Sequence, residues 1–140
     1  VEHGQQGGDE INIIKVGGNF GYPVITYSRR YSGDALGDGL TTKEGMEQPA
    51  YFWSPSIAPS GMLFYVGDLF SVWKGNLFVG GLSGKRIARL VLRDNRIIGE
   101  ESLLEELGLR IRDLAQGPDG ALYILTAEDN GQLLRLTPSD

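Results

Sequence analysis

The chain has 140 residues, of which 41% are hydrophobic and 22% charged, so its composition is that of a small globular protein and excludes a disordered tail. The formal net charge is -5 and the basic residues do not cluster, which excludes nucleic acid and anionic membranes as expected partners. Cysteine is absent, which excludes disulfides and thiolate chemistry, and no apolar run approaches the roughly 20 residues that a membrane-spanning helix needs.

Short apolar runs separated by glycine, proline, aspartate or asparagine predict an all-β chain. The predicted strands are INIIKV (11–16), PVITYS (23–28), GMLFYVG (61–67), NLFVGGL (76–82), RIARLVLR (86–93), NRIIGEE (95–101), IRDLAQ (111–116), ALYILT (121–126) and QLLRLTP (132–138). YFWSPSIAPSGM (51–62) is predicted as a loop that leads into the innermost strand of a sheet. Asp94-Asn95 marks a hairpin turn, and ESLLEELG (101–108) is the one helix candidate, with helix and irregular structure left open.

An internal repeat organises these strands. APSGMLFYV (58–66) resembles QGPDGALYIL (116–125), and a second match aligns Leu77 with Leu122 and Arg89 with Arg135. A period of about 45 residues with several strands in each unit is typical of β-propeller blades, of which closed propellers have roughly 4 to 8. We therefore expect residues 1–140 to be the C-terminal portion of a single propeller domain, covering about three blades.

The stretch EHGQQGGDEINII (2–14) places two glycine-containing turns and an acidic pair before an apolar run. One interpretation is a loop in which the Glu10 carboxylate joins main-chain carbonyls around a hard cation such as Ca²⁺, which takes about 6 to 8 oxygen ligands. The alternative is that Asp9 and Glu10 are solvated turn residues. Spacing alone does not decide between the two.

Arg110 and Arg112 lie two apart in a predicted strand, so both guanidinium groups leave the same face. Two like charges on one face indicate an anionic partner, because arginine binds carboxylates in bidentate fashion. The alternatives are a solvated outer face, or pairing with Asp113 and the acidic run Glu100-Glu101. His3 is the one histidine, and no serine lies in a GxSxG elbow, so no hydrolase or multi-histidine metal site is indicated.

Four stretches together resemble the soluble aldose sugar dehydrogenases that depend on pyrroloquinoline quinone (PQQ), in the glucose/sorbosone dehydrogenase family. They are EHGQQGGDEINIIKVGGNFGYP (2–23), MEQPAYFWSPSIAPSGMLFY (46–65), NLFVGGLSG (76–84) and RIRDLAQGPDGALYILTAEDNGQLLRL (110–136). The resemblance covers nearly the whole chain. It implies a six-bladed β-propeller with PQQ and Ca²⁺ at the mouth of the channel.

The resemblance also implies metal-ligating residues. Gly4 and Gln5 match the pair whose main-chain carbonyls ligate the PQQ-bound calcium, with Gln5 where the family usually has proline. Glu10 matches a carboxylate ligand of a second, structural calcium. Phe20 matches a residue that contributes its carbonyl to that ion, where relatives usually have tyrosine.

Cofactor contacts are implied in three segments, and the matching residues are Tyr31, Gly81, Leu82, Ser83, Arg110, Ile111 and Arg112. The arginine pair would meet the carboxylates of PQQ, and Asp113 would orient an arginine or the turn. The family often has lysine at the position of Ser83, so this chain lacks that cation there, although Lys85 is close in sequence.

The activity that the resemblance implies is oxidation of aldoses at C1 to lactones. The family's general base is a histidine in the N-terminal half, and His3 is not that residue. No catalytic residue is therefore expected in this chain, which would need the N-terminal propeller half. The sequence indicates neither the sugar nor the electron acceptor, and the family implies a periplasmic or secreted location. The alternatives are a non-catalytic, calcium-stabilised propeller that binds a ligand, and a propeller hydrolase such as a lactonase.

Overall fold

The structure is a computed structural model that describes residues 1–139, and it divides into two compact units. The first is Val1–Ala58 and the second begins at Pro59, and each is described by itself. The prediction of one domain over residues 1–140 stays a prediction. No helix among the described residues has the length and apolar character that crossing a membrane requires.

The first unit consists mainly of loops. β1 (Asp9–Ile11) pairs antiparallel with β2 (Tyr51–Trp53), and isolated bridges join the remaining segments. The predicted strands over 11–16 and 23–28 are wrong, since β1 ends at Ile11 and Ile25 makes only a single bridge. The apolar residues that suggested the first of these strands, such as Ile14 and Val16, are exposed and pack against no sheet. β2 lies where a loop was predicted.

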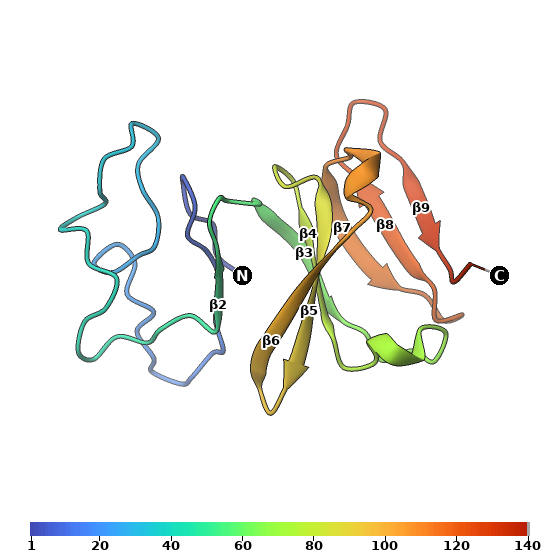
Figure 1. Cartoon of the computed structure of the whole chain (residues 1–140), viewed down its shortest axis with the longest axis horizontal. Helices are drawn as coiled ribbons and strands as arrows, with labels where there is room; N and C mark the ends of the chain where they lie inside the picture. Colours follow the sequence, from blue (N-terminus) through green and yellow to red (C-terminus); the bar gives the residue numbers. More distant parts are fainter. Residues whose placement is uncertain (140) are drawn as a thin grey trace. The chain divides into compact units, whose positions relative to one another are not determined.

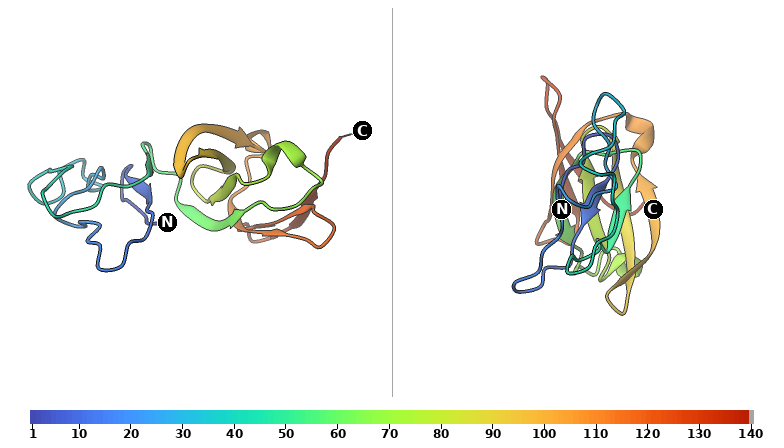
Figure 2. Two further views of the ribbon diagram at one scale, coloured as in Figure 1. Left: turned by 90° about the horizontal axis from the view of Figure 1, so that it is seen from below. Right: turned by 90° about the vertical axis from the view of Figure 1, so that its left-hand side faces the viewer.

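The second unit contains two antiparallel sheets in which each strand pairs with the next along the chain (Figures 1 and 2). The first sheet has the strands β3 (Pro59–Phe64), β4 (Leu77–Gly81), β5 (Arg86–Arg93) and β6 (Arg96–Leu103). The second has β7 (Ile111–Gln116), β8 (Leu122–Thr126) and β9 (Leu133–Leu136). This meander is the form of a propeller blade, as the sequence predicted.

The β5–β6 connection is the two-residue hairpin that the sequence predicted. Arg93 pairs with Arg96, and the intervening Asp94 and Asn95 have φ angles of 49° and 58°. Both values fall in the left-handed region that a type I′ turn requires, and aspartate and asparagine tolerate it better than most residues.

For the segment 101–108 the sequence left helix and irregular structure open. The structure shows a strand end and one short turn there, and no α-helix. The first three residues of the segment extend β6, and only a single 3₁₀ turn, η2 (Glu105–Leu107), follows. Leu104 and Gly108 flank that turn with φ angles of 59° and 62°, so the chain reverses at both ends and no α-helix can continue. A second 3₁₀ turn, η1 (Ser71–Trp73), connects β3 to β4.

The structure confirms one of the two repeat matches. Leu77 and Leu122 are buried at the start of β4 and β8, the second strands of the two sheets. Arg89 pairs with Phe78 and Arg135 with Tyr123, which are equivalent positions in the two registers. The match between 58–66 and 116–125 is wrong, because residues 59–64 form the first strand of a sheet whereas 122–126 form the second.

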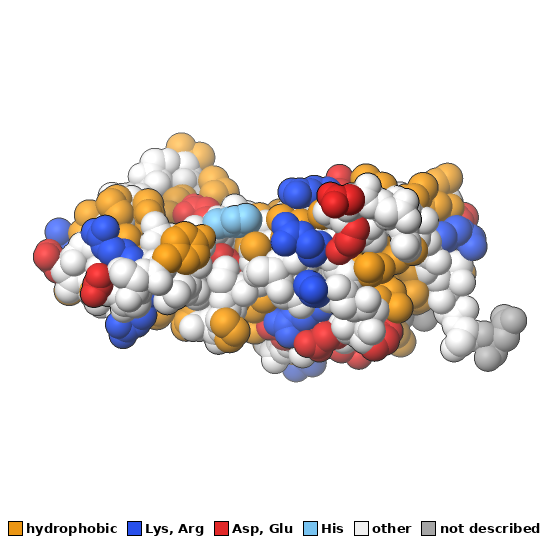
Figure 3. Space-filling model, turned by 90° about the horizontal axis from the view of Figure 1, so that it is seen from above, with side chains coloured by type: hydrophobic (Ala, Val, Ile, Leu, Met, Phe, Trp, Pro, Cys, Tyr) orange, Lys and Arg blue, Asp and Glu red, His pale blue; other side chains and the backbone are white. Residues whose placement is uncertain are grey.

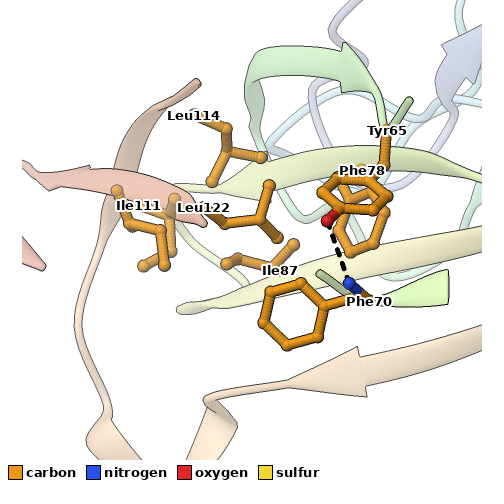
Figure 4. Close-up of a cluster of buried hydrophobic side chains, with 8 residues drawn as sticks. Tyr65, Phe70, Phe78, Ile87, Ile111, Leu114 and Leu122 are labelled. Carbon is orange, nitrogen blue, oxygen red and sulfur yellow. Dashed lines mark hydrogen bonds between the residues drawn. The ribbon is translucent and has the colours of Figure 1, made fainter. Parts of the chain in front are cut away.

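The core of the second unit lies between the two sheets, where β7 packs against β3 and β4 (Figure 4). Eight buried side chains form it: Tyr65, Phe70, Phe78, Ile87, Ile111, Leu114, Leu122 and Ile124. The Tyr65 hydroxyl is the polar centre of this cluster, since it donates to the Gly120 carbonyl at 2.8 Å and accepts the Phe70 N–H at 3.0 Å. It thus joins β3, the turn before η1 and the turn before β8.

Tyr65→Phe tests the contribution of this hydroxyl to stability. The change leaves a buried N–H and a buried carbonyl without a partner, so we expect the free energy of unfolding to fall by about 1 to 3 kcal/mol. Urea denaturation followed by fluorescence measures it. Tyr123→Phe is the matched control, because that hydroxyl bonds to Asp119 and Arg135 at the surface. Equal losses in the two variants would contradict the prediction.

Candidate functional site

The buried carboxylate of Asp9 organises the opening loop of the chain. Its Oδ1 accepts the Gly4 N–H at 2.7 Å. Its Oδ2 accepts the Ser56 hydroxyl at 2.5 Å and the N–H groups of Ile57 and Ala58 at 2.7 and 2.8 Å. Asp9 is fully buried, so it is not the solvated turn residue that one interpretation assumed. It holds the loop 2–10 against the segment 56–58.

Glycine is required where this loop is wound most tightly. A Cβ on Gly4 would lie 1.9 Å from the Gly7 carbonyl oxygen, and one on Gly8 would lie 2.4 Å from the Ser28 nitrogen. Gly8 also has a φ of 73°, which side chains disfavour. The glycines of GQQGG therefore allow the main chain to pass close to itself and to the segment around Ser28.

Two successive carbonyls of this loop have no hydrogen-bond partner within residues 1–139. The Gln5 N–H donates to the Ser28 hydroxyl at 2.7 Å, and the Gln6 N–H donates to the Arg29 carbonyl at 3.1 Å. The carbonyl oxygens of Gly4 and Gln5, the two predicted calcium ligands, accept no hydrogen bond from the part of the chain that the structure describes. These oxygens are free to ligate a cation.

Tyr31 lies near this loop. Its side chain is exposed, and its carbonyl accepts a hydrogen bond from the Gln6 side chain at 3.1 Å. The loop also borders an open hollow of about 570 Å³, lined by Gln5, Gln6, Gly7, Ser54, Pro55 and Ser56. The structure thus brings Tyr31 to the loop that carries Gly4 and Gln5, as a shared site would need.

A second oxygen cluster surrounds Glu10. Glu2 and Glu10 are antiparallel bridge partners, which places their side chains on one face, and the Asn12 side chain donates to Glu2 at 3.2 Å and to Glu10 at 3.4 Å. The pKa of Glu10 is raised above its usual value, chiefly because the carboxylate is buried. The Asn12 hydrogen bond opposes this shift, and the charge of Glu2 adds to it. Asn12 Oδ1 is buried and has no partner within residues 1–139. Asn12 was not among the predicted site residues, although it follows Glu10 by two residues.

Phe20 is the second residue predicted for this cluster. Phe20 is half-buried in the loop after β1, and its carbonyl oxygen accepts no hydrogen bond from the described residues. No hydrogen bond joins Phe20 to Glu10 in residues 1–139. Its part in a calcium site stays a prediction.

In the second unit, two predicted cofactor-binding stretches meet. The Ser60 hydroxyl on β3 bonds to the Ile111 carbonyl at 2.7 Å and to the Gly80 carbonyl at 3.0 Å. A Cβ on Gly80 would lie 2.8 Å from the Ile111 side chain, so glycine lets β4 approach β7 closely. The end of β4, from Gly81 onward, therefore lies beside the start of β7.

The turn after β4 contains both buried and exposed residues. Gly81 and Leu82 are buried, whereas Ser83 and Lys85 are exposed. Lys85 has a φ of 50°, because it closes the four-residue turn between β4 and β5. Ser83 and Lys85 therefore lie in the same turn, and Lys85 is fixed there by the conformation that closes it.

Arg110, just before β7, and Arg112 flank the buried Ile111, and both are exposed. That both guanidinium groups leave one strand face stays a prediction. A β-bulge follows, since Ile111 pairs with Thr126 while Asp113 pairs with Leu125, which leaves Arg112 as the extra residue. Neither guanidinium group makes a hydrogen bond or ion pair with any described residue.

The acidic residues that might have neutralised this pair are engaged elsewhere. Arg86 binds Glu100 at 2.8 Å and Arg89 binds Glu101 at 2.6 Å. Asp113 accepts the N–H of its neighbour Leu114 at 2.9 Å, so it stabilises the bulge and does not orient an arginine. On the face in Figure 3, basic and acidic side chains lie next to one another. The alternative in which these acids pair with Arg110 and Arg112 is therefore wrong.

Comparison with known proteins identifies the family of the chain. The family model described as "Glucose / Sorbosone dehydrogenase" matches residues 1–135. The aldose sugar dehydrogenase YliI of Escherichia coli is 42% identical over 98% of this chain and 37% of its own length. An uncharacterized protein of Synechocystis is 46% identical over 97% of this chain and 33% of its own length.

Solved structures agree as well. A crystal structure of a glucose dehydrogenase superposes with a TM-score of 0.93 at 44% identity, covering 99% of this chain and 40% of the other. The PQQ-bound aldose sugar dehydrogenase from Streptomyces coelicolor gives 0.70 at 26% identity, covering 97% and 38%. The chain therefore belongs to the glucose/sorbosone dehydrogenase family, which is a family of oxidoreductases, and its fold is part of a β-propeller. It spans about a third to two fifths of the length of these relatives.

Asp9→Asn tests the role of the buried carboxylate in the opening loop. The amide has one acceptor oxygen in place of two, and its NH₂ group would face N–H donors, so we expect a loss of about 3 kcal/mol in the free energy of unfolding. Denaturant titration measures the loss. Asp38→Asn is the control, because Asp38 is exposed. A loss in Asp9→Asn no larger than that of the control would contradict this account.

Proposed function

We propose that this chain supplies part of the PQQ- and calcium-binding site of a dehydrogenase that oxidises aldoses at C1 to lactones. The observation that carries the proposal is the exposed arginine pair at the start of β7, whose guanidinium groups form no ion pair with any described residue. The Glu128 carboxylate accepts the main-chain N–H of Arg110 at 2.8 Å and no guanidinium N–H. A tricarboxylate such as PQQ supplies the missing negative charge, and the fork of arginine donors suits carboxylates.

When bound, PQQ would accept hydride from the sugar and calcium would polarise the accepting carbonyl. The residues of this chain would bind and orient these groups. Arg110 and Arg112 would hold carboxylates, while the unpartnered carbonyls of Gly4 and Gln5 would ligate calcium. Calcium accepts main-chain oxygens readily, so the donors fit the ion.

The Glu10 cluster fits a second calcium ion. Glu10 is a buried carboxylate that pairs with no cation within residues 1–139, and it lies opposite Glu2. Asn12 Oδ1 is a buried acceptor without a partner in the same range. No three His, Cys, Asp or Glu side chains form a metal-binding group within residues 1–139. Main-chain and amide oxygens, including the Phe20 carbonyl, would therefore complete the coordination.

Within the whole enzyme, this chain would position the cofactor and leave proton abstraction to another part. Its one histidine, His3, lies in the candidate calcium loop. The chain would be inactive alone. The whole enzyme would work in the periplasm or outside the cell and pass its electrons to an acceptor that this chain does not identify. The second candidate is a calcium-stabilised propeller that binds a ligand without catalysis, which serine at position 83, in place of lysine, favours.

The test of the proposal is dye-linked oxidation of glucose and other aldoses by the full-length protein after addition of PQQ and Ca²⁺. We expect activity that requires both additions. In Arg110→Ala/Arg112→Ala we expect PQQ binding to weaken at least about 100-fold, because two charge-assisted contacts of about 1.5 to 3 kcal/mol each are lost.

The matched control for that variant is Arg93→Ala/Arg96→Ala, which removes an exposed pair of arginines from the tip of the β5–β6 hairpin. We expect this control to bind PQQ as the wild type does. A folded protein that binds no PQQ and oxidises no aldose would refute the proposal. Calcium binding without PQQ binding would favour the non-catalytic candidate.

The Glu10 cluster gives a separate prediction about stability. Without PQQ, millimolar Ca²⁺ should raise the Tm of the wild type, because an ion that binds only the folded state stabilises it by mass action. In Glu10→Gln this increase should be lost, since the ligand charge is removed. Differential scanning fluorimetry with and without a chelator measures the effect, and the exposed Glu44→Gln is the control. An unchanged calcium response in Glu10→Gln would contradict this assignment.

A further inference from the structure

We propose that Ser28 is a positioning residue whose hydroxyl directs the main-chain carbonyl of Gly4 toward the bound calcium ion. The proposal rests on the proposed function, because it concerns the calcium that accompanies PQQ. Ser28 touches no candidate ligand oxygen. It acts through the peptide unit that carries one of them.

The geometry of the peptide bond makes this action direct. The N–H of Gln5 and the C=O of Gly4 belong to one planar, trans unit, in which the two bonds point in opposite directions. The Gln5 N–H points at the Ser28 hydroxyl, 2.7 Å away, so the Gly4 carbonyl points away from Ser28. By the same reasoning, the Gln6 N–H, held at 3.1 Å by the Arg29 carbonyl, turns the Gln5 carbonyl away from residue 29.

The two carbonyls therefore point to the same side of the loop, away from the segment 28–29. In an extended strand successive carbonyls alternate, so this pairing needs a constraint on each peptide unit. The Arg29 carbonyl supplies one constraint through the main chain. The Ser28 hydroxyl supplies the other through a side chain, and that is the one that a substitution can remove.

The hydroxyl itself is fixed in orientation. It lies 3.3 Å from the Arg29 carbonyl, to which it donates, and this leaves a lone pair for the Gln5 N–H. The Ser28 N–H donates to the Thr26 hydroxyl at 3.0 Å, which holds the main chain of the serine. Ser28 is only 5% exposed, so water does not readily replace its hydroxyl. A buried hydroxyl that accepts one hydrogen bond and donates another therefore fixes the orientation of the Gly4–Gln5 peptide plane.

Ser28→Ala in the full-length protein tests the inference. The readout is the free Ca²⁺ concentration that gives half-maximal binding of PQQ, followed by the PQQ absorbance, and not turnover. We expect that concentration to rise about tenfold, as is typical when a group that orients a metal ligand is removed. Ser28→Thr retains the hydroxyl, so it should restore most of the affinity.

Two further measurements separate positioning from general stability. Ser28→Ala leaves the Gln5 N–H without its acceptor, so the Tm of the calcium-free protein should fall by a few degrees, as for other lost buried hydrogen bonds. Positioning predicts that the calcium requirement rises beyond this loss, even at a temperature at which the calcium-free variant is fully folded. Ser71→Ala, at an exposed serine in η1, is the matched control and should behave as the wild type in both assays.

Each outcome decides the matter. A calcium requirement within about twofold of the wild type in Ser28→Ala would overturn the inference and leave the proposed function intact. Equal weakening in Ser28→Ala and Ser28→Thr, or a fall in the calcium-free Tm that accounts for the whole effect, would show that the hydroxyl does not direct the carbonyl. A wild-type protein that binds PQQ without calcium, or binds neither, would instead refute the proposed function on which the inference rests.

Discussion

The burial of one carboxylate determines the form of the first unit. Asp9 lies out of contact with water, and four hydrogen bonds from distant parts of the unit converge on it. A buried carboxylate is tolerated only when such donors satisfy it, so the main chain at Gly4 and at residues 56–58 has to present them. This constraint lets a unit with only two short strands hold a defined loop, because side-chain to main-chain bonds replace the ladder of a sheet.

The two units differ in how much of them the sequence could predict. In the second unit, strands such as RIARLVLR and IRDLAQ were predicted with their observed bounds, because burial follows their apolar positions and Asp94-Asn95 determines the hairpin. In the first unit, INIIKV had the composition of a strand, yet most of it is an exposed loop. The hydrogen bonds of Asp9, which hold the opening loop, join residues 47 to 49 positions apart, a separation that local patterns do not report. The helix candidate failed for a local reason instead, namely the left-handed conformation of Leu104.

The candidate site shows the same division. The sequence placed Arg110 and Arg112 on one face, but it could not decide whether nearby acids neutralise them. The structure decides this point, since Glu100 and Glu101 lie opposite β5 and bind its arginines. Asn12 and Ser28 carry no motif, and their importance follows only from what they contact. Asn12 has a buried oxygen without a partner, and Ser28 holds the peptide unit of a candidate ligand.

A site built from main-chain oxygens responds to substitution differently from one built from side chains. If Gly4, Gln5 and Phe20 act through their carbonyls, the side chains at positions 5 and 20 are free to differ from those of the relatives, provided that the main chain keeps its course. The residues that cannot change are then the ones that fix that course, namely the glycines with no space for a Cβ, Asp9 and Ser28. Position 83 is the opposite case, because a lysine there would act through its own charge and serine does not replace it. Under the proposed function, the departure at Ser83 would therefore bear on cofactor affinity, whereas those at Gln5 and Phe20 would not.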